Sequence, residues 1–327
     1  MDYLSADSLP WVREIQQRLR AARTARRLPP ALLLISPVGL GAEQLASWIT
    51  ALALCESQSG APCGVCPSCV LLRADNHPDF YPVRLLEDAQ QIKVDQIREL
   101  IEALSLSSYR GGFKVAVVEG AEALNANGAN AFLKTLEEPA GDTVLILIAR
   151  PSHRLPATVA SRCQRVSLRA PPRTEALAWL KARAPDVNSW DAALELAGGA
   201  PLLALNLPQE DIAQLDREMR ETLKRLAADA VDITSLADAW AKSDWQHKLL
   251  WLENWITRCV QADLLSDGSL QSAEHVRLPA ALLKAKIRAL FELLDSSREL
   301  RRLASTGLNQ QLALESLLLG GRAALGK

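Results

Sequence analysis

Short apolar runs alternate with helical segments through the first half of the 327-residue chain, and the alternation stops near residue 168. The runs that we expect to be strands are Ala31–Ile35, 80–85, 113–118, Thr143–Ala149 and 165–168. The segments that we expect to be helices are 7–28, Ala42–Leu54, 93–107 and 125–138. Aliphatic runs such as Ala31–Ile35 are typical of strands buried on both faces. The pattern predicts an α/β domain with a parallel sheet and helices on both faces.

Only helical patterns follow the Ala-Pro-Pro segment at 170–172. Short helices are expected at 174–184, 190–197 and 201–205, and longer ones at 211–228, 245–265, 279–296 and 309–319. The change of pattern predicts three domains: an α/β domain at 1–168, a small helical domain at 169–207 and an all-α domain at 208–327.

Composition limits the class of protein and its compartment. Hydrophobic residues make up 49% and charged residues 23% of the chain, which is typical of a folded protein and excludes a disordered one. Lys plus Arg number 37 and Asp plus Glu number 38, and the net charge of −1 argues against a DNA-coating protein. Because the N-terminus lacks a secretory signal and no apolar run approaches the ~20 residues of a bilayer span, we expect a cytoplasmic protein that contacts no membrane. In a reducing compartment, clustered cysteines favour metal binding over disulfides.

Four cysteines follow the spacing C-x7-C-x2-C-x2-C: Cys55, Cys63, Cys66 and Cys69. Gly64 and Pro67 lie in the two-residue gaps, where the backbone must turn for two sulfurs to reach one ion. Four thiolates without a nearby histidine or carboxylate predict a closed, structural Zn²⁺ site, and the alternative is a group of buried or redox-active thiols. Cys163 and Cys259 stand alone and are expected in the core.

A segment between the first strand and the next helix has the position of a nucleotide phosphate loop but lacks its chemistry. The working motif is G-x-x-x-x-G-K-[ST], whose Lys neutralises phosphate charge and whose Ser or Thr holds Mg²⁺. The corresponding residues here are Ser36, Gly39, Gly41, Ala42 and Glu43. Ala42 replaces the Lys, and Glu43 replaces the Ser or Thr with a negative charge whose repulsion is on the order of 1–4 kcal/mol at ~4 Å. The alternative is that this loop never served a nucleotide.

The third expected strand ends in a second degenerate motif. In an active ATPase this strand ends in an Asp that positions Mg²⁺, and the next residue is a Glu that polarises water. Glu119 can imitate the Asp, but Gly120 has no side chain that acts as a base. The two defects together predict an ATPase-like domain that neither binds nor hydrolyses ATP.

Several segments resemble the AAA+ subunits of the bacterial DNA polymerase III clamp loader. They are 31–41, the cysteine module at 55–69, His77-Pro78-Asp79, the segment Asn130 to Pro139, Ser161-Arg162-Cys163, and the last-helix segment 308–315. The resemblance covers essentially the whole chain and implies an AAA+ domain, a small helical lid domain and a C-terminal helical collar. Active members carry an Arg in a Gly-x-x-Arg pattern, where this chain has Leu202.

The resemblance also implies a function. Arg162, flanked by Ser161 and Cys163, would be an arginine finger that acts in trans on the ATP site of a neighbouring subunit, and the alternative is an arginine in a surface salt bridge. The chain would be a non-hydrolysing stator of a hetero-pentameric complex with tau/gamma ATPase subunits and a delta subunit, which loads the sliding clamp on primed DNA. It would have no activity of its own and would be classed with its holoenzyme, a DNA-directed DNA polymerase (nucleotidyltransferase).

Two other functions stay open from the residues alone: an active AAA+ ATPase subunit of the same complex, and a zinc-dependent DNA-binding protein. Four tryptophans also have two interpretations: Trp240, Trp245, Trp251 and Trp255. They pack in the core of the C-terminal domain, or they form contacts between subunits of the collar.

Overall fold

The computed structural model describes residues 9–57, 62–86, 89, 91–151, 155–185, 187, 190–207, 209–243, 245–264, 280–303 and 309–325. The chain divides into two compact units, Met1–Pro172 and Arg173–Lys327. The expected end of the α/β domain at residue 168 lies shortly before this boundary. The division of the second unit into a lid at 169–207 and a collar at 208–327 stays a prediction.

A five-stranded parallel sheet forms the centre of the first unit. Its strands are β1 (Ala31–Ile35), β2 (Phe80–Val83), β3 (Lys114–Glu119), β4 (Thr143–Ala149) and β5 (Gln164–Ser167), in the spatial order β2-β3-β4-β1-β5. Strand β1 pairs with β4 on one side and with β5 on the other, so that Leu33 lies opposite both Leu147 and Arg165. The short strand β5 and the strand β2 form the two edges.

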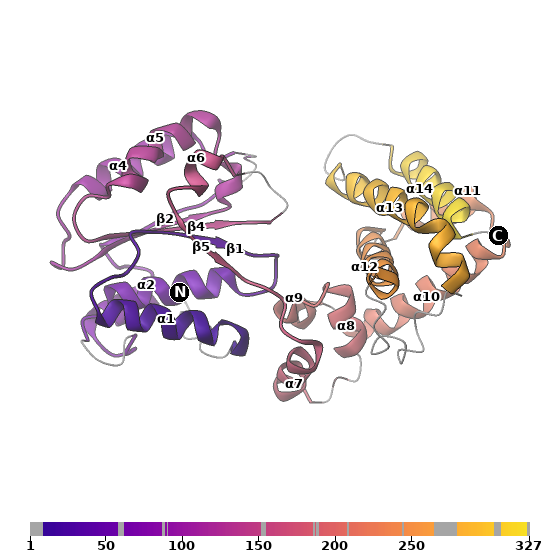
Figure 1. Ribbon diagram of the computed structural model, residues 1–327, viewed down its shortest axis with the longest axis horizontal. Coiled ribbons are helices and arrows are strands. Elements are labelled where there is room, and N and C mark those ends of the chain that lie inside the picture. The colour runs from indigo at the N-terminus through magenta and orange to yellow at the C-terminus, as the bar shows by residue number, and fades with distance from the viewer. Residues whose placement is uncertain are drawn as a thin grey trace. The chain divides into compact units, whose positions relative to one another are not determined.

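Helices cover both faces of this sheet (Figure 1). Helices α1 (Arg13–Thr24) and α2 (Ala42–Leu54) lie on one face, and α4 (Val94–Ser105), α5 (Ala126–Glu137) and α6 (Ala157–Ala160) lie on the other. A further helix, α3 (Pro67–Arg73), packs against α2, and 3-10 turns occupy Pro10–Val12 and Ala121–Ala123. The predicted parallel sheet with helices on both faces is therefore confirmed.

Most expected elements end within a few residues of their observed bounds, and β1, α2 and β4 match at both ends. The expected helix at 7–28 is shorter: residues 7 and 8 lie outside the described part, and α1 ends at Thr24. Arg26 then adopts a positive φ of 54°, which a continuing helix does not allow.

Alternate residues of the central strands supply the core between the sheet and α4, α5 and α6. Ala31 and Leu33 of β1 point to this face with Leu145 and Leu147 of β4, while Leu32 and Leu34 are buried on the other. The strands are apolar on both sides because both faces are covered.

Truncation of Phe132 should destabilise the first unit strongly. Its side chain is fully buried between α5 and the sheet. We expect Phe132→Ala to lower the free energy of unfolding by about 3–5 kcal/mol, because it removes a large apolar group and leaves a cavity. Denaturant unfolding measures this. Tyr109→Ala is the matched control, since Tyr109 is 82% exposed, and its change should stay within about 0.5 kcal/mol. Equal changes in the free energy of unfolding for the two substitutions would contradict the burial of Phe132 between α5 and the sheet.

The second unit contains only helices among its described residues. They are α7 (Arg173–Arg183), α8 (Trp190–Leu196), α9 (Pro201–Asn206), α10 (Gln209–Ala227), α11 (Ile233–Ala241), α12 (Trp245–Leu264), α13 (Ala280–Arg302) and α14 (Gln310–Leu325). Residues 265–279 and 308 lie outside the described part. They include the last residue of the expected helix 245–265 and the first residues of the expected segments 279–296 and 308–315. No helix in the described ranges has both the length and the hydropathy that a membrane span requires.

All four tryptophans of the 240–255 segment are buried within the second unit. Trp251 and Trp255 stack with their ring centroids 6.4 Å apart, and the Trp251 indole N–H donates to Asp216 Oδ1 at 3.0 Å. Their burial favours the core interpretation over subunit contacts. Asn254 donates to the carbonyl of Leu196 at 2.6 Å and so joins α12 to α8.

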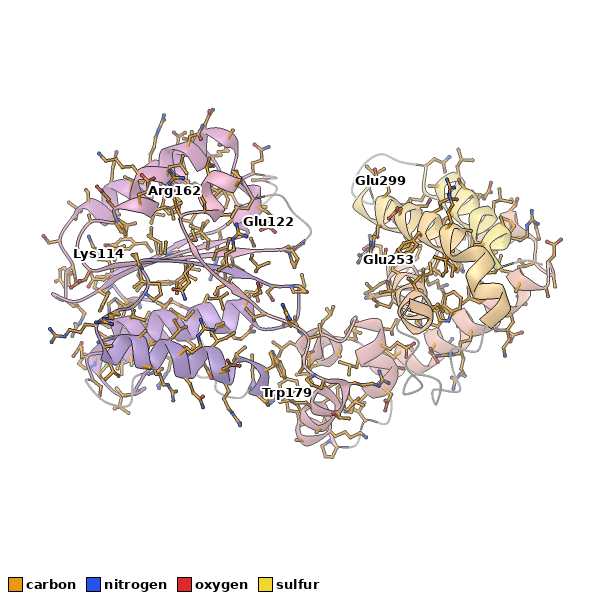
Figure 2. The ribbon with its side chains drawn as sticks, viewed as in Figure 1. Lys114, Glu122, Arg162, Trp179, Glu253 and Glu299 are labelled. Carbon is orange, nitrogen blue, oxygen red and sulfur yellow. The ribbon has the colours of Figure 1, made fainter. Side chains whose placement is uncertain are left out.

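One acidic side chain is also buried in the second unit. Glu253 of α12 accepts from Ser297 Oγ at 3.2 Å and from Arg301 at 2.9 Å, both on α13 (Figure 2). Burial raises the pKa of this carboxyl, although the Arg301 charge opposes the shift. The ion pair and the Ser297 hydrogen bond therefore join α12 to α13.

Candidate functional site

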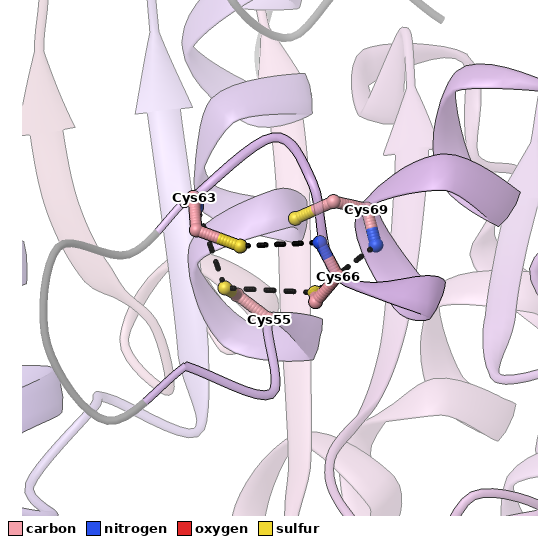
Figure 3. Close-up of side chains that lie close together, drawn as sticks. All are labelled: Cys55, Cys63, Cys66 and Cys69. Atoms are coloured by element: carbon pink, nitrogen blue, oxygen red, sulfur yellow. Dashed lines mark hydrogen bonds between the residues drawn. The ribbon is translucent and has the colours of Figure 1, made fainter.

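The four clustered cysteines converge at the carboxyl end of α2 (Figure 3). Their sulfur atoms all lie within 4.8 Å of one another: Cys55, Cys63, Cys66 and Cys69. The Sγ atoms of Cys55 and Cys66 are 3.9 Å apart, close to the about 3.8 Å that a tetrahedron with Zn–S bonds of about 2.3 Å requires. Within the described residues this is the one group of three or more Cys, His, Asp or Glu that could hold a metal ion.

Local backbone geometry explains why the four thiols meet. Cys55 ends α2, as expected, and Gly64 turns the chain with a φ of 74°. Pro67 begins α3, the helix that carries Cys69. Backbone N–H groups of Cys63, Cys66 and Cys69 each donate to the sulfur of the preceding cysteine in the cluster at 3.4 Å. This pattern is typical of a thiolate-rich metal site.

The thiols differ in their ease of ionisation. Backbone N–H groups of Val65 and Cys66 lower the pKa of Cys63 to about 6, whereas burial raises the pKa of Cys69 to about 12 and also raises that of Cys55. Zn²⁺ deprotonates coordinating thiols outright and would make the cluster uniformly anionic. The donor set and its geometry fit Zn²⁺.

Side chains of the cysteine module itself, of α3 and of two other segments hold the module in place. Arg23 of α1 donates to the carbonyls of Leu52 and Cys55 at 3.2 and 3.1 Å, at the exposed carbonyl end of α2. Arg73 donates to the Gly64 carbonyl at 2.7 Å. Glu56 accepts from Ser68 at 2.7 Å and also from Arg110 at 2.7 Å.

The His77-Pro78-Asp79 segment has a structural arrangement. The Asp79 carboxylate is 1% exposed and accepts from the backbone of Tyr109 at 2.7 Å and of Arg110 at 3.0 Å. His77 Nδ1 accepts from the Asp79 backbone N–H at 3.1 Å, and burial lowers the pKa of its imidazole. Asp79 thus fixes the loop that precedes β3.

The degenerate phosphate loop lies at the amino end of α2, the helix whose carboxyl end leads into the cysteine cluster. Gly39 and Gly41 have φ angles of 82° and 89°, and Gly41 is the residue before α2. Ala42 is buried, and Glu43 is exposed in the first turn. Leu40 is 1% exposed, and its carbonyl accepts from the Trp11 indole at 2.9 Å, so the N-terminal segment contacts the loop. The thirteen residues of α2 separate loop and cysteines by about 20 Å.

The acidic position at the end of β3 already has a partner. Arg84 Nε donates to Glu119 Oε1 at 2.9 Å, and this ion pair neutralises the carboxylate in the position expected for a Mg²⁺ ligand. Gly120 has a φ of 70°, a conformation that favours glycine. Glu122 follows and accepts from the backbone of Arg150 at 3.4 Å (Figure 2).

Ser161, Arg162 and Cys163 join α6 to the edge strand β5. Cys163 is buried in the core, where burial raises its pKa to about 11, and its thiol donates to the Val159 carbonyl at 3.4 Å. Ser161 Oγ donates to the Thr158 carbonyl at 3.2 Å. The two neighbours therefore fix the backbone on either side of Arg162, whose side chain is 31% exposed.

The structure separates Arg162 from the phosphate loop of its own chain. Arg162 precedes β5, whose first residue Gln164 pairs with Leu32, near the start of β1, whereas the loop follows the end of β1. Because β1 and β5 are parallel, Arg162 and the loop lie toward opposite ends of these two neighbouring strands, about 13 Å or more apart along the strand direction. Arg162 therefore lies away from the phosphate loop of its own chain.

Both units match models of one protein family. Residues 11–172 match the family described as DNA polymerase III, delta subunit, and residues 212–322 match DNA polymerase III, delta subunit, C terminal. A DNA polymerase III subunit delta-prime from Pseudomonas aeruginosa is 33% identical over 322 residues, covering 96% of this chain and 97% of the relative. The chain belongs to the DNA polymerase III delta-prime family. The Escherichia coli member is also 33% identical over 322 residues, covering 95% of this chain and 94% of its own.

The family matches follow the division of the fold: residues 11–172 lie in the first unit and residues 212–322 in the second. The first unit is an α/β domain with strand order β2-β3-β4-β1-β5 and helices on both faces, and the described residues of the second unit are all-α. A solved structure of a gamma subunit-related protein of DNA polymerase III from Thermotoga maritima aligns with 94% of this chain and 99% of its own at 18% identity, with a TM-score of 0.45. The expected family resemblance is confirmed, while the roles of individual residues stay predictions.

Sequence reasoning missed three partners of the candidate residues. They are Trp11 at the phosphate loop, Arg84 at Glu119, and Glu137, whose carboxylate binds Arg162. The Glu137-Glu138-Pro139 sequence gave a signal for the last, because an acid at the end of a helix is unfavourable next to the helix dipole unless a cation lies near it.

Proposed function

We propose that this chain is a non-hydrolysing stator subunit of a clamp loader, and that it supplies Arg162 in trans to the ATP site of a neighbouring subunit. The observation that carries the proposal is the position of Arg162 at the amino end of β5, whereas the phosphate loop follows the carboxyl end of the neighbouring parallel strand β1. An arginine there cannot serve its own chain, but it can meet a nucleotide held by an adjacent subunit. Arg suits this role because it is always charged and spreads its donors over the γ-phosphate oxygens.

Four features of the chain argue against hydrolysis at its own loop. Ala42 provides no positive charge, and Glu43 adds a negative one. Glu119 is paired with Arg84, and Gly120 cannot act as a base. An ATP bound here would lack both charge neutralisation and an activated water.

The remaining parts of the proposal concern partners and metal. The tau/gamma ATPase subunits and a delta subunit would complete a hetero-pentameric ring that opens the sliding clamp onto primed DNA in the cytoplasm. The cysteine cluster would hold structural Zn²⁺ and take no part in the reaction. The isolated chain would have no catalytic activity, and only the holoenzyme would act as a nucleotidyltransferase.

The isolated chain should show no saturable binding of ATP at millimolar nucleotide, because its loop offers repulsion where an active loop offers a lysine. Isothermal titration in the presence of Mg²⁺ measures this, and an isolated tau/gamma subunit serves as the positive control. The same chain should join the complex formed by tau/gamma and delta subunits in gel filtration. Saturable ATP binding would favour an active ATPase subunit and would overturn the stator assignment.

A further inference from the structure

The carboxylate of Glu137 holds the guanidinium of Arg162 from one side. Arg162 Nε donates to Glu137 Oε1 at 2.6 Å, and Arg162 Nη2 lies 2.5 Å from the same oxygen. Arg162 Nη1 donates to the carbonyl of Thr158 at 2.9 Å. The side chain is thereby fixed at all three of its nitrogen atoms, although it is 31% exposed.

These contacts leave a defined part of the guanidinium available to a ligand. A guanidinium has five N–H donors, and the contacts to Glu137 and Thr158 use one on each nitrogen. The two donors that remain lie one on Nη1 and one on Nη2. This arrangement suits bidentate binding of two oxygens of one phosphate.

The packing of α5 against the sheet determines where Glu137 lies. Phe132 and Leu136 of this helix are buried in the core against the sheet, whereas Glu137, the last residue of the helix, is exposed. Pro139 follows and cannot continue the helix. The negative end of the α5 dipole adds to the attraction between this helix end and the Arg162 cation.

An exposed arginine without such a partner would sample many rotamers. Ordering a free arginine on binding costs side-chain entropy. Glu137 holds the guanidinium in one orientation before a neighbouring subunit arrives, so less ordering is required when the nucleotide is met. Since it does so through a single oxygen on one side, it does not block the two remaining donors.

We propose that Glu137 is a positioning residue for the arginine finger: it orients Arg162 so that the free donors of Nη1 and Nη2 face the γ-phosphate of the neighbouring ATP site. This inference rests on the proposed function of Arg162. Glu137 thereby gains a role in the hydrolysis that a neighbour performs, rather than serving only as the last residue of α5.

Single-turnover ATP hydrolysis by the reconstituted complex, with clamp and primed DNA, tests this role. We expect Glu137→Ala to slow hydrolysis by about 10- to 100-fold at the site that receives Arg162, the size of effect that misplacement of a reacting group produces. ATP affinity and assembly should not change. Glu137→Gln keeps an acceptor for Nε and should restore most of the rate. Glu138→Gln, at the exposed neighbouring acid, is the matched control and should leave the rate unchanged.

A double-mutant cycle separates positioning from a structural role. If Glu137 acts through Arg162, Glu137→Ala should cost nothing further in an Arg162→Ala background. The same additional loss in both backgrounds, a faster rate in Glu137→Ala, or an unchanged rate alongside a slow Arg162→Ala complex would overturn the inference while leaving the function of Arg162 intact. An unchanged rate in Arg162→Ala would overturn the proposed function itself.

NMR of the free chain provides a readout that is independent of assembly. With arginine-labelled protein, the Arg162 Nε–H signal should be protected and sharp, because a carboxylate accepts from it. Glu137→Ala should remove this protection, and Glu138→Gln should not. An Arg162 signal that is the same in all three proteins would show that Glu137 does not hold the guanidinium, and would overturn the inference.

Discussion

Arg162→Ala should slow ATP hydrolysis at the neighbouring site by about 10³-fold or more when the clamp loader is reconstituted from this chain and its partners. Arginine fingers supplied in trans contribute 10³ to 10⁵ to phosphoryl-transfer rates, because they stabilise charge that develops on the γ-phosphate oxygens. Rapid-quench measurement of a single turnover, with the clamp and primed DNA present, separates ATP hydrolysis at this site from slower steps of the reaction cycle. Assembly in gel filtration should be unchanged, since the exposed part of Arg162 contributes little to folding.

Arg165→Ala is the matched control for this experiment. Arg165 is an exposed arginine three residues further along, in the edge strand β5. Its loss should leave hydrolysis unchanged, which would exclude a general effect of positive charge at this edge of the sheet. If the Arg162→Ala complex hydrolyses ATP at the normal rate, the assignment of an arginine finger is wrong.

Cys69→Ala should abolish zinc binding and destabilise the first unit by about 4 kcal/mol, at the upper end of the effects of single substitutions. Cys69 is completely buried on α3 and is one of the four converging thiols. The binding energy of a structural metal stabilises the fold directly, because the unfolded chain has no preformed site. Elemental analysis of protein purified without chelators measures the zinc, and denaturant unfolding measures the stability.

Cys163→Ala offers a matched comparison for the cluster. Cys163 is also a buried thiol of the first unit, but it lies in the core between α5, α6 and the sheet. Its loss should cost about 1 kcal/mol and leave the zinc content unchanged. Native protein that contains no stoichiometric zinc would overturn the metal assignment outright, whatever the stability of the variants.

The sequence predicted the parts of the fold that depend on periodicity and on strong breakers. Ala31–Ile35 lies between Pro30 and a glycine turn, and its uniform apolar character identified a buried central strand. The helix Ala42–Leu54 is similarly bounded by Gly41 and Cys55. The four clustered cysteines were found because their spacing is a local property of the chain.

The elements that sequence reasoning missed are short or lack a clear apolar period. Helix α6 has four residues, and α3 lies within the cysteine module. Helix α11 carried a usable signal in Asp232, whose carboxylate caps the backbone N–H groups of Thr234 and Ser235. The Arg84–Glu119 ion pair depends on tertiary proximity, which no local pattern encodes. The acid at the end of α5 indicated only that a cation lies near Glu137, and not that this cation is Arg162.

The pairing of β1 has a consequence for the order in which the chain folds during synthesis. Both neighbours of this strand come much later: β4 begins at Thr143 and β5 at Gln164. The cysteine cluster, by contrast, closes between Cys55 and Cys69 and requires only a short loop. The four cysteines can therefore come together before the sheet forms, while the apolar strand β1 stays unpaired until residues 143–167 have been synthesised. Over that interval the nascent chain exposes an apolar, aggregation-prone segment.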